Sequence, residues 1–154
     1  MTGCKTTTTA ASTAMEKEVK TMPQGRLLEV SYEERGMNFP EYGDFKLSRR
    51  FGPPTLAFRH WSDEVKIEVS DSLFDVALNI IKEGRMYEYE TLYDDTPKGI
   101  QMLDGTKWDF TAVFEGKQYI FSGGRSTWPE DKKGLDLIIQ LLTDTAKKGC
   151  EEKQ

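Results

Sequence analysis

Apolar and polar residues alternate along most of this chain, in short segments separated by turn residues. Successive side chains of a β-strand point to opposite faces, so this alternation predicts strands with one face in a core and the other in solvent. Glu115-Gly116 is expected to turn the last two segments into a hairpin. The predicted strands are residues 26–32, 45–48, 56–58, 65–69, 87–93, 108–114 and 117–122.

The period changes to helical spacing in two places. Residues 71–83 form the first predicted helix, with Ser72 in a capping-box-like position, Ser70 or Asp71 as alternative caps, and Gly84 ending it in a left-handed conformation. The second predicted helix has Pro129 in its first turn and ends at Gly149. Apolar residues line one face of each helix: Leu73, Val76, Ala77, Ile80 and Ile81 in the first, and Leu135, Ile138, Ile139, Leu142 and Ala146 in the second.

The order of these elements, ββββ-α-βββ-α, indicates the α+β class. We predict an antiparallel sheet of about six to seven short strands, with both helices packed on one face. Residues 26–149 are expected to form this single domain. Residues 1–25 are expected to form a flexible, Thr-rich tether and residues 150–154 a C-terminal tail.

Charge and residue counts exclude several classes of function. The net charge is −5 and basic residues are scattered, so nucleic acid is not expected as a partner. The two cysteines, Cys4 and Cys150, lie at opposite ends of the chain, and His60 is the only histidine. A disulfide framework or a zinc site is therefore not expected, and no cofactor or metal is predicted.

The opening residues Met1-Thr2-Gly3-Cys4 are similar to the last four positions of a bacterial lipoprotein signal. In that signal, small residues precede the cysteine that becomes lipidated. Each buried CH2 of an acyl chain contributes about 0.8 kcal/mol, so lipid on Cys4 would hold the domain at a membrane. The alternative is a cytoplasmic domain with a disordered N-terminal tail.

Several motifs occur together in a recognisable order. Their sequences are LDGTKW at residues 103–108, FEG at 114–116 and SGGRS at 122–126, with YEERGM at 32–37 and FKLSR at 45–49 upstream. This set resembles a family of small bacterial lipoproteins and secreted domains of unknown function, of the Bacteroides type. The resemblance implies a location in the cell envelope, and it assigns no activity and no functional residue. Lys5 and threonines follow Cys4 in place of the acidic residues of surface-exported members, so the membrane leaflet stays open.

Gly123-Gly124-Arg125 is a candidate binding segment. Consecutive glycines can expose backbone N–H groups to an anion, and Arg125 could clamp a carboxylate or phosphate. The structural alternative is that two glycines let the chain leave a strand and turn into a helix.

Aromatic residues suggest a second candidate surface. Trp61 and Trp128, with the tyrosines of residues 87–93, could contact a glycan or a protein. Aromatic residues at period two are also typical of the core face of a sheet.

His60 is the one candidate for a general base with a pKa near neutrality. A hydrolase would use it with nearby acids, but the sequence places no serine or cysteine nucleophile beside it, although Ser48, Ser62 and Ser126 are present. The alternative is a histidine at a strand end that a backbone carbonyl satisfies.

Two groups of acidic residues complete the candidates. Asp94, Asp95 and Asp104 could hold calcium, although their spacing lacks the EF-hand pattern and fits a solvated loop. Glu88 and Glu90 could form a carboxylate pair, although glycosidase pairs usually come from separate elements.

The sequence therefore predicts a non-enzymatic, lipid-anchored domain of the bacterial cell envelope, periplasmic or on the surface, with a binding or scaffolding role. Its expected partners are the membrane, through a lipid on Cys4, and an unknown protein or glycan. The alternatives are a hydrolase that uses His60 and a cytoplasmic domain.

Overall fold

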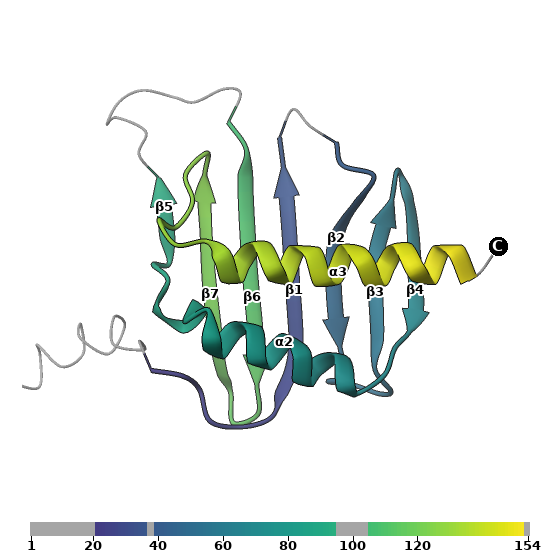
Figure 1. Ribbon diagram of the computed structural model, residues 1–154, viewed down its shortest axis with the longest axis horizontal. Helices are drawn as coiled ribbons and strands as arrows, with labels where there is room; N and C mark the ends of the chain where they lie inside the picture. Colours follow the sequence, from purple (N-terminus) through teal and green to yellow (C-terminus); the bar gives the residue numbers. More distant parts are fainter. Residues whose placement is uncertain (1–20, 37–38, 95–104, 153–154) are drawn as a thin grey trace, which may run out of the picture.

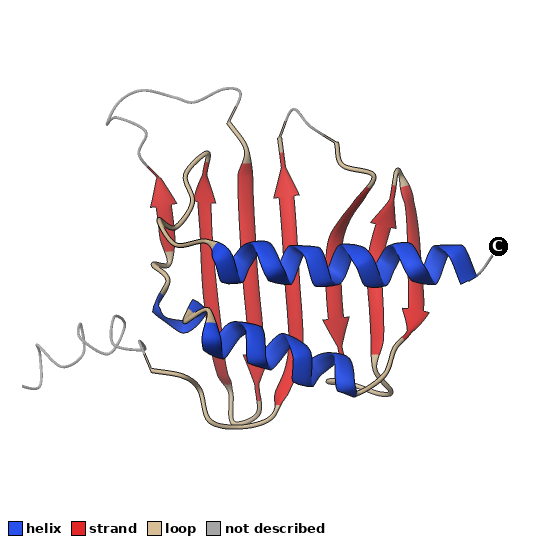
Figure 2. Ribbon diagram, viewed as in Figure 1, coloured by secondary structure: helices blue, strands red, loops and turns tan. Residues whose placement is uncertain are grey.

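The computed structural model describes residues 21–36, 39–94 and 105–152, which form a seven-stranded sheet with two helices on one face (Figure 1). The strand order across the sheet is β4-β3-β2-β1-β6-β7-β5. Both helices cross the same face (Figure 2), so the predicted α+β class, its element order and its layers are confirmed. The elements are β1 (Leu27–Arg35), β2 (Tyr42–Ser48), β3 (Thr55–His60), β4 (Asp63–Glu68), α2 (Ser72–Glu83), η1 (Met86–Glu88), β5 (Leu92–Asp94), β6 (Lys107–Phe114), β7 (Gln118–Arg125) and α3 (Lys133–Glu152).

The sheet is antiparallel except at one edge, where β5 pairs in parallel with β7. The predicted hairpin between β6 and β7 is confirmed, and Gly116 and Lys117 both have positive φ in its turn (82° and 61°). Positive φ at both central residues matches the right-handed twist of the two strands.

The strand predicted over residues 87–93 is wrong for most of its length. A 3-10 helix, η1, occupies its beginning, and only Leu92 and Tyr93 at its end belong to β5. Arg85 adopts a left-handed conformation (φ 52°) directly after α2 and turns the chain. The alternating tyrosines are nevertheless partly buried against the core. Packing of this segment, and not a strand, therefore explains why its tyrosines are spaced by two.

The predicted ends of α2 need correction. Gly84 does end the helix, but in a right-handed conformation (φ −79°). Its N–H donates to Ile80 O at 2.8 Å, so the helical hydrogen bonding continues to this residue. At the other end, Asp71 makes no side-chain capping hydrogen bond, and the Ser72 N–H donates to the Ser70 hydroxyl at 3.1 Å. The capping box at Ser72 is therefore wrong.

The predicted ends of α3 are also wrong. The helix begins at Lys133, whose N–H donates to Asp131 Oδ1 at 3.2 Å, so Pro129 precedes its first turn. It continues through Gly149 to Glu152, so residues 150–152 are helical and are not part of a tail. A side chain at position 149 would collide with Ile67 of β4. Gly149 therefore lets the helix lie close to the sheet instead of ending it.

The domain also begins before residue 26. Pro23 is buried and Met22 packs against the core. The Gln24 N–H donates to Gln118 Oε1 at 3.1 Å, which ties this segment to the start of β7. The last residues of the predicted tether therefore belong to the folded domain.

The core fills the space between the sheet and the helices. Every strand except β5 contributes buried residues from one face, as period-two alternation requires. The two helices approach closely where α2 ends and α3 begins, because a methyl group on Gly84 would lie 2.8 Å from Gly134 Cα. The largest fully buried side chains are Trp108, Phe74, Phe110, Phe114, Leu27, Leu47, Leu56, Ile81, Met86, Leu135, Ile138 and Leu142.

Candidate functional site

The glycine pair predicted to form an anion site lies within a strand, next to the edge of the sheet. Gly123, Gly124 and Arg125 are the last residues of β7, between β6 and β5, and both glycines are buried. The Gly123 N–H donates to Thr91 O at 3.0 Å, so it is not available to an anion. The predicted anion nest therefore lacks the Gly123 N–H, and the turn predicted at these residues is wrong because they belong to β7. The chain turns afterwards, at Ser126, which has positive φ (50°).

The glycines are needed for close packing. A methyl group on Gly124 would lie 2.8 Å from Tyr93 O and 2.6 Å from Trp108 Nε1. A methyl group on Gly123, on the other face, would lie 2.6 Å from Asp109 Oδ1. Because neither glycine carries a side chain, β5 and the large Trp108 ring can pack closely against β7.

The two tryptophans of the predicted binding surface do not lie together. Trp61 is in the turn between β3 and β4, has positive φ (55°) and is 53% exposed. Trp128 follows β7, and the strands β2, β1 and β6 separate β3 from β7. A single surface containing both residues is therefore not formed.

Trp128 instead belongs to a row of packed rings. Its ring stacks on Trp108 at 6.5 Å between centroids, Trp108 stacks on Tyr93 at 6.1 Å, and Tyr93 contacts Tyr89 edge-on at 6.4 Å. Trp108 is fully buried and its Nε1–H donates to Thr127 O at 2.8 Å. The tyrosines of residues 87–93 thus extend the core, as the structural alternative stated.

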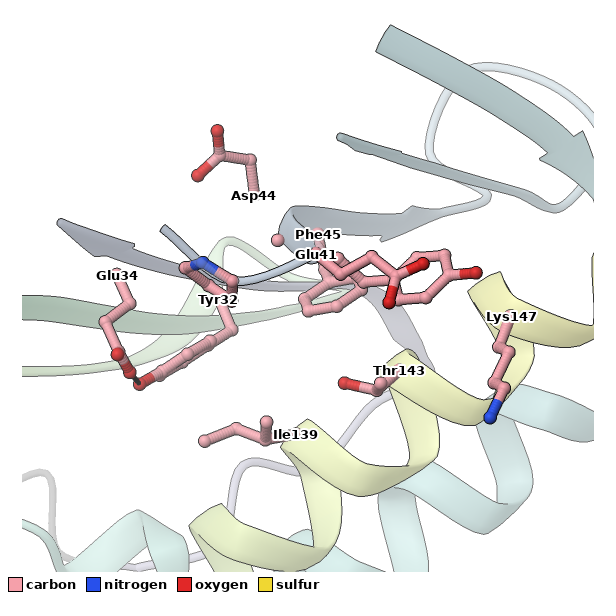
Figure 3. A pocket seen from close by; sticks show the side chains of 11 residues that line it. Tyr32, Glu34, Glu41, Asp44, Phe45, Ile139, Thr143 and Lys147 are labelled. Atoms are coloured by element: carbon pink, nitrogen blue, oxygen red, sulfur yellow. Dashed lines mark hydrogen bonds between the residues drawn. The ribbon is translucent and has the colours of Figure 1, made fainter. Parts of the chain in front are cut away.

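A pocket of about 430 Å³ lies between the sheet and the middle part of α3, from Ile139 to Lys147. Figure 3 shows Tyr32 and Phe45 on the sheet side and Ile139 and Thr143 on the helix side. Residues 40–41, between β1 and β2, complete the wall. Pockets of about 300–1,000 Å³ with aromatic walls and a few polar groups are typical of small-molecule sites.

A buried tyrosine and a carboxylate form one end of the pocket. The Tyr32 hydroxyl donates to Glu34 Oε1 at 2.6 Å, and the two residues lie on the same face of β1 because they are two apart. Burial, with the hydrogen bond to Glu34 and its negative charge, raises the pKa of Tyr32 well above its usual range, while a hydrogen bond with the Trp128 side chain acts in the opposite direction. Tyr32 therefore keeps its proton and remains a donor to Glu34.

The opposite end of the pocket contains Glu41, which also contacts the only histidine. Glu41 Oε2 lies 3.0 Å from His60 Nε2, and the His60 ring stacks on Tyr42 at 4.6 Å between centroids. His60 itself does not line the pocket. In the part of the chain that the structure describes, no hydroxyl or thiol group bonds to His60. The hydrolase alternative stays a prediction, without a nucleophile beside its base.

The helix contributes residues spaced by one turn. Ile139, Thr143 and Lys147 follow one another at intervals of four on α3 and therefore share one side of the helix. The partly buried Ile139 packs against the core, whereas Lys147 is exposed. Polarity thus increases along this wall toward the C-terminal end of α3.

Asp44 lines the pocket through its position in β2, but its side chain points to the other face of the sheet (Figure 3). A register irregularity between Gly43 and Lys46, with positive φ at Asp44 (51°), causes this orientation. The carboxylate accepts from Arg35 at 2.6 Å and from Arg59 at 3.3 Å. These two arginines neutralise Asp44, so it adds little negative charge to the pocket.

The other acidic candidates lie outside the pocket or outside the described residues. Glu88 pairs with Arg85 at 2.6 Å. Asp94 lies in β5, whereas Asp95, Asp104 and the lipidation candidate Cys4 lie outside the described residues. Among the described residues, no cluster of histidine, cysteine or acidic side chains could hold a metal ion. No helix there is long and apolar enough to cross a membrane.

Sequence reasoning missed the pocket. Tyr32 and Phe45 lie in predicted strands, and nothing in the local sequence distinguishes a pocket wall from a core. A weak signal was present in α3, where Thr143 and Lys147 continue the line of Ile139 with polar residues. Comparison of the chain with protein-family models, curated proteins and solved structures found no match, so the lipoprotein resemblance stays a prediction.

The buried tyrosines give the fold a specific sensitivity to alkaline pH. Burial and the charge of Asp131 raise the pKa of Tyr89 to about 12, with a backbone hydrogen bond from Leu135 opposing the shift. In the unfolded chain a tyrosine has a pKa of about 10. The stabilisation by these protonated tyrosines is complete below that pH and is lost as the pH rises toward their pKa in the folded state, because the unfolded state then releases protons that the folded state retains. We expect the unfolding free energy from urea titrations to fall above pH 10, and Tyr89→Phe to reduce that slope. An unchanged slope in this variant would contradict the assignment.

Proposed function

We propose that this chain is a lipid-anchored domain of the bacterial cell envelope that binds a small ligand in the pocket between β1, β2 and α3. The observation that carries the proposal is the pocket itself, which has a volume of about 430 Å³. Aromatic and aliphatic side chains supply its walls, and Glu34, Glu41 and Thr143 supply a few polar groups. This combination favours ligand binding over a purely structural role.

The position of the pocket supports a tethered protein. The first described residues contact the turn between β6 and β7, at the end of the sheet where β1 begins (Figure 1). Tyr32 and Glu34 lie near the other end of β1. Seven residues of extended chain separate Leu27 from Glu34, which is about 23 Å. A tether to a lipid on Cys4 would therefore join the domain at the end of the sheet opposite to Tyr32 and Glu34, where it does not cover them.

Binding by the pocket is tested with one variant that fills it. Thr143→Trp places a large side chain into the pocket, and Gln140→Trp places the same side chain at an exposed position of the same helix. The test is a screen of a library of small molecules of mixed charge, followed by thermal shift and by NMR of the Ile139 and Thr143 methyl groups. Ligands are expected to bind wild type and Gln140→Trp, and to lose binding in Thr143→Trp, with circular dichroism confirming that all three fold. If no compound binds, or if binding survives in Thr143→Trp, the pocket is not the site.

The anchor is tested separately, with the gene at its native locus. The wild-type protein is expected in the membrane fraction, released only by detergent, with an intact mass above that of the polypeptide by the mass of its acyl chains. Cys4→Ser is expected to move the protein to the soluble fraction, whereas Cys150→Ser leaves it in the membrane fraction. A soluble wild-type protein with no added mass would favour the cytoplasmic alternative.

A further inference from the structure

We infer that the ligand of this pocket carries a cationic amine, which Glu34 receives through a charge-assisted hydrogen bond. The inference rests on the proposed function and adds the chemical class of the ligand. Its basis is the arrangement of charge and aromatic rings around the pocket.

Negative charge predominates among the pocket side chains. Glu34 and Glu41 are carboxylates, and Lys147 is the one cation among the described residues that line the pocket. The third lining carboxylate, Asp44, points to the other face of the sheet and pairs with two arginines. Asp136, on α3, adds a further negative charge that acts on the Tyr32 hydroxyl. An ammonium group in the pocket would therefore meet an attractive potential, whereas a carboxylate would meet repulsion.

Glu34 is positioned to make the directional contact. It is partly buried, and within the described ranges the Tyr32 hydroxyl is its only hydrogen-bond donor. That donor holds Oε1, so the carboxylate is oriented and retains acceptor capacity for a ligand. A hydrogen bond to an ionised group in a partly desolvated site is about twice as strong as one between neutral groups.

Aromatic rings provide a second feature that suits a cation. Tyr32, Tyr42 and Phe45 line the sheet side of the pocket. The face of an aromatic ring attracts cations by about 0.5–2 kcal/mol, depending on desolvation. The same rings, with Ile139 opposite, offer apolar contact to the carbon skeleton of an amine.

The position of Lys147 predicts the orientation of the ligand in the pocket. It lies one helical turn beyond Thr143, at the exposed end of the pocket, whereas Tyr32 and Glu34 lie toward Ile139 (Figure 3). A bound amine would place its ammonium at Glu34, away from Lys147. A neutral or anionic end of the ligand would then lie near Thr143 and Lys147.

The test compares probes that share a carbon skeleton and differ in charge. The first pair is tyramine and tyrosol, an amine and its alcohol. The second set is cadaverine, pentanediol and glutarate. By calorimetry at neutral pH and low salt, wild type is expected to bind each amine at least about tenfold more tightly than its alcohol, and to bind glutarate most weakly.

Two matched variants assign the contact. Glu34→Gln is expected to abolish the preference for amines, whereas Glu33→Gln, its neighbour on the exposed face of β1, is expected to keep it. Both variants remove one negative charge from the same strand, so a loss in both would show a general charge effect and overturn the assignment to Glu34. Circular dichroism checks the fold of each variant, and the comparison of probes on wild type needs no variant.

The outcomes separate the two proposals. If alcohols or glutarate bind the pocket as tightly as amines, the inference is overturned and the proposed function stands. If no probe and no library compound binds, both the inference and the proposed ligand-binding function are overturned. If amines bind with the expected preference but equally well in Glu34→Gln, the contact residue is wrong.

Discussion

Trp108→Ala is expected to lower the free energy of unfolding by about 3–5 kcal/mol, the largest effect of any single substitution considered for this domain. Trp108 is the largest fully buried side chain among the residues that the structure describes, and its ring stacks between Trp128 and Tyr93. Its removal would leave a cavity that two flanking rings cannot easily fill. Urea titration followed by circular dichroism measures the loss.

Two further variants separate the causes of this loss. Trp108→Phe keeps part of the ring volume but removes the Nε1–H that donates to Thr127 O, so the hydrogen-bond component should be about 0.5–1.5 kcal/mol. Trp61→Ala removes the same side chain from an exposed turn and should change stability by less than about 0.5 kcal/mol. Equal losses in Trp108→Ala and Trp61→Ala would contradict the packing argument.

Gly124→Ala is expected to cost about 1–3 kcal/mol although it adds only one methyl group. That methyl would lie 2.6 Å from Trp108 Nε1 and 2.8 Å from Tyr93 O, and one of these is a backbone atom of the neighbouring strand β5. The sheet can accommodate it only by moving β5 or by tilting the Trp108 ring. Amide hydrogen exchange should therefore increase first in β5 and at Thr127.

Gly52→Ala is the matched control, since no atom lies within 4 Å of the position that its methyl group would take. Its stability is expected to equal that of the wild type or to exceed it slightly, because alanine restricts the unfolded chain. A cost at Gly124 no larger than that at Gly52 would mean that β5 is packed too loosely to need the glycine.

Much of the fold could be predicted from the sequence, because most strands bury one face and alternate accordingly. The period of two located six of the seven strands, and the helical spacing located both helices. The segment at residues 87–93 failed for a physical reason. Its tyrosines pack against the core from an irregular segment, and spacing alone does not distinguish such packing from a strand.

Glycine was the other source of error. Gly84 ends α2 without left-handed geometry, Gly149 lies inside α3, and Gly123 and Gly124 lie inside β7. In the last three cases the residue is needed because another part of the chain passes close by. Local sequence does not contain that information, so the same residue type was assigned to turns and helix ends.

The pocket could not be predicted, because it depends on contacts between distant segments. Tyr32 and Thr143 are more than one hundred positions apart, and they meet only because α3 crosses the sheet over β1 and β2. The irregularity in β2 that turns Asp44 away from the pocket has no local signal either. Its effect on the charge of the site depends on Arg35 and Arg59, which pair with Asp44 and come from other strands.

The two edge strands of the sheet determine how readily the domain could pair with a strand from another molecule. One edge is β4, in which charged residues occupy four positions: Asp63, Glu64, Lys66 and Glu68. The other edge is β5, which is only three residues long. Neither a heavily charged edge nor a very short one is a good template for a strand from another molecule. Two copies of this domain that meet edge to edge therefore have little tendency to join their sheets, even at high concentration.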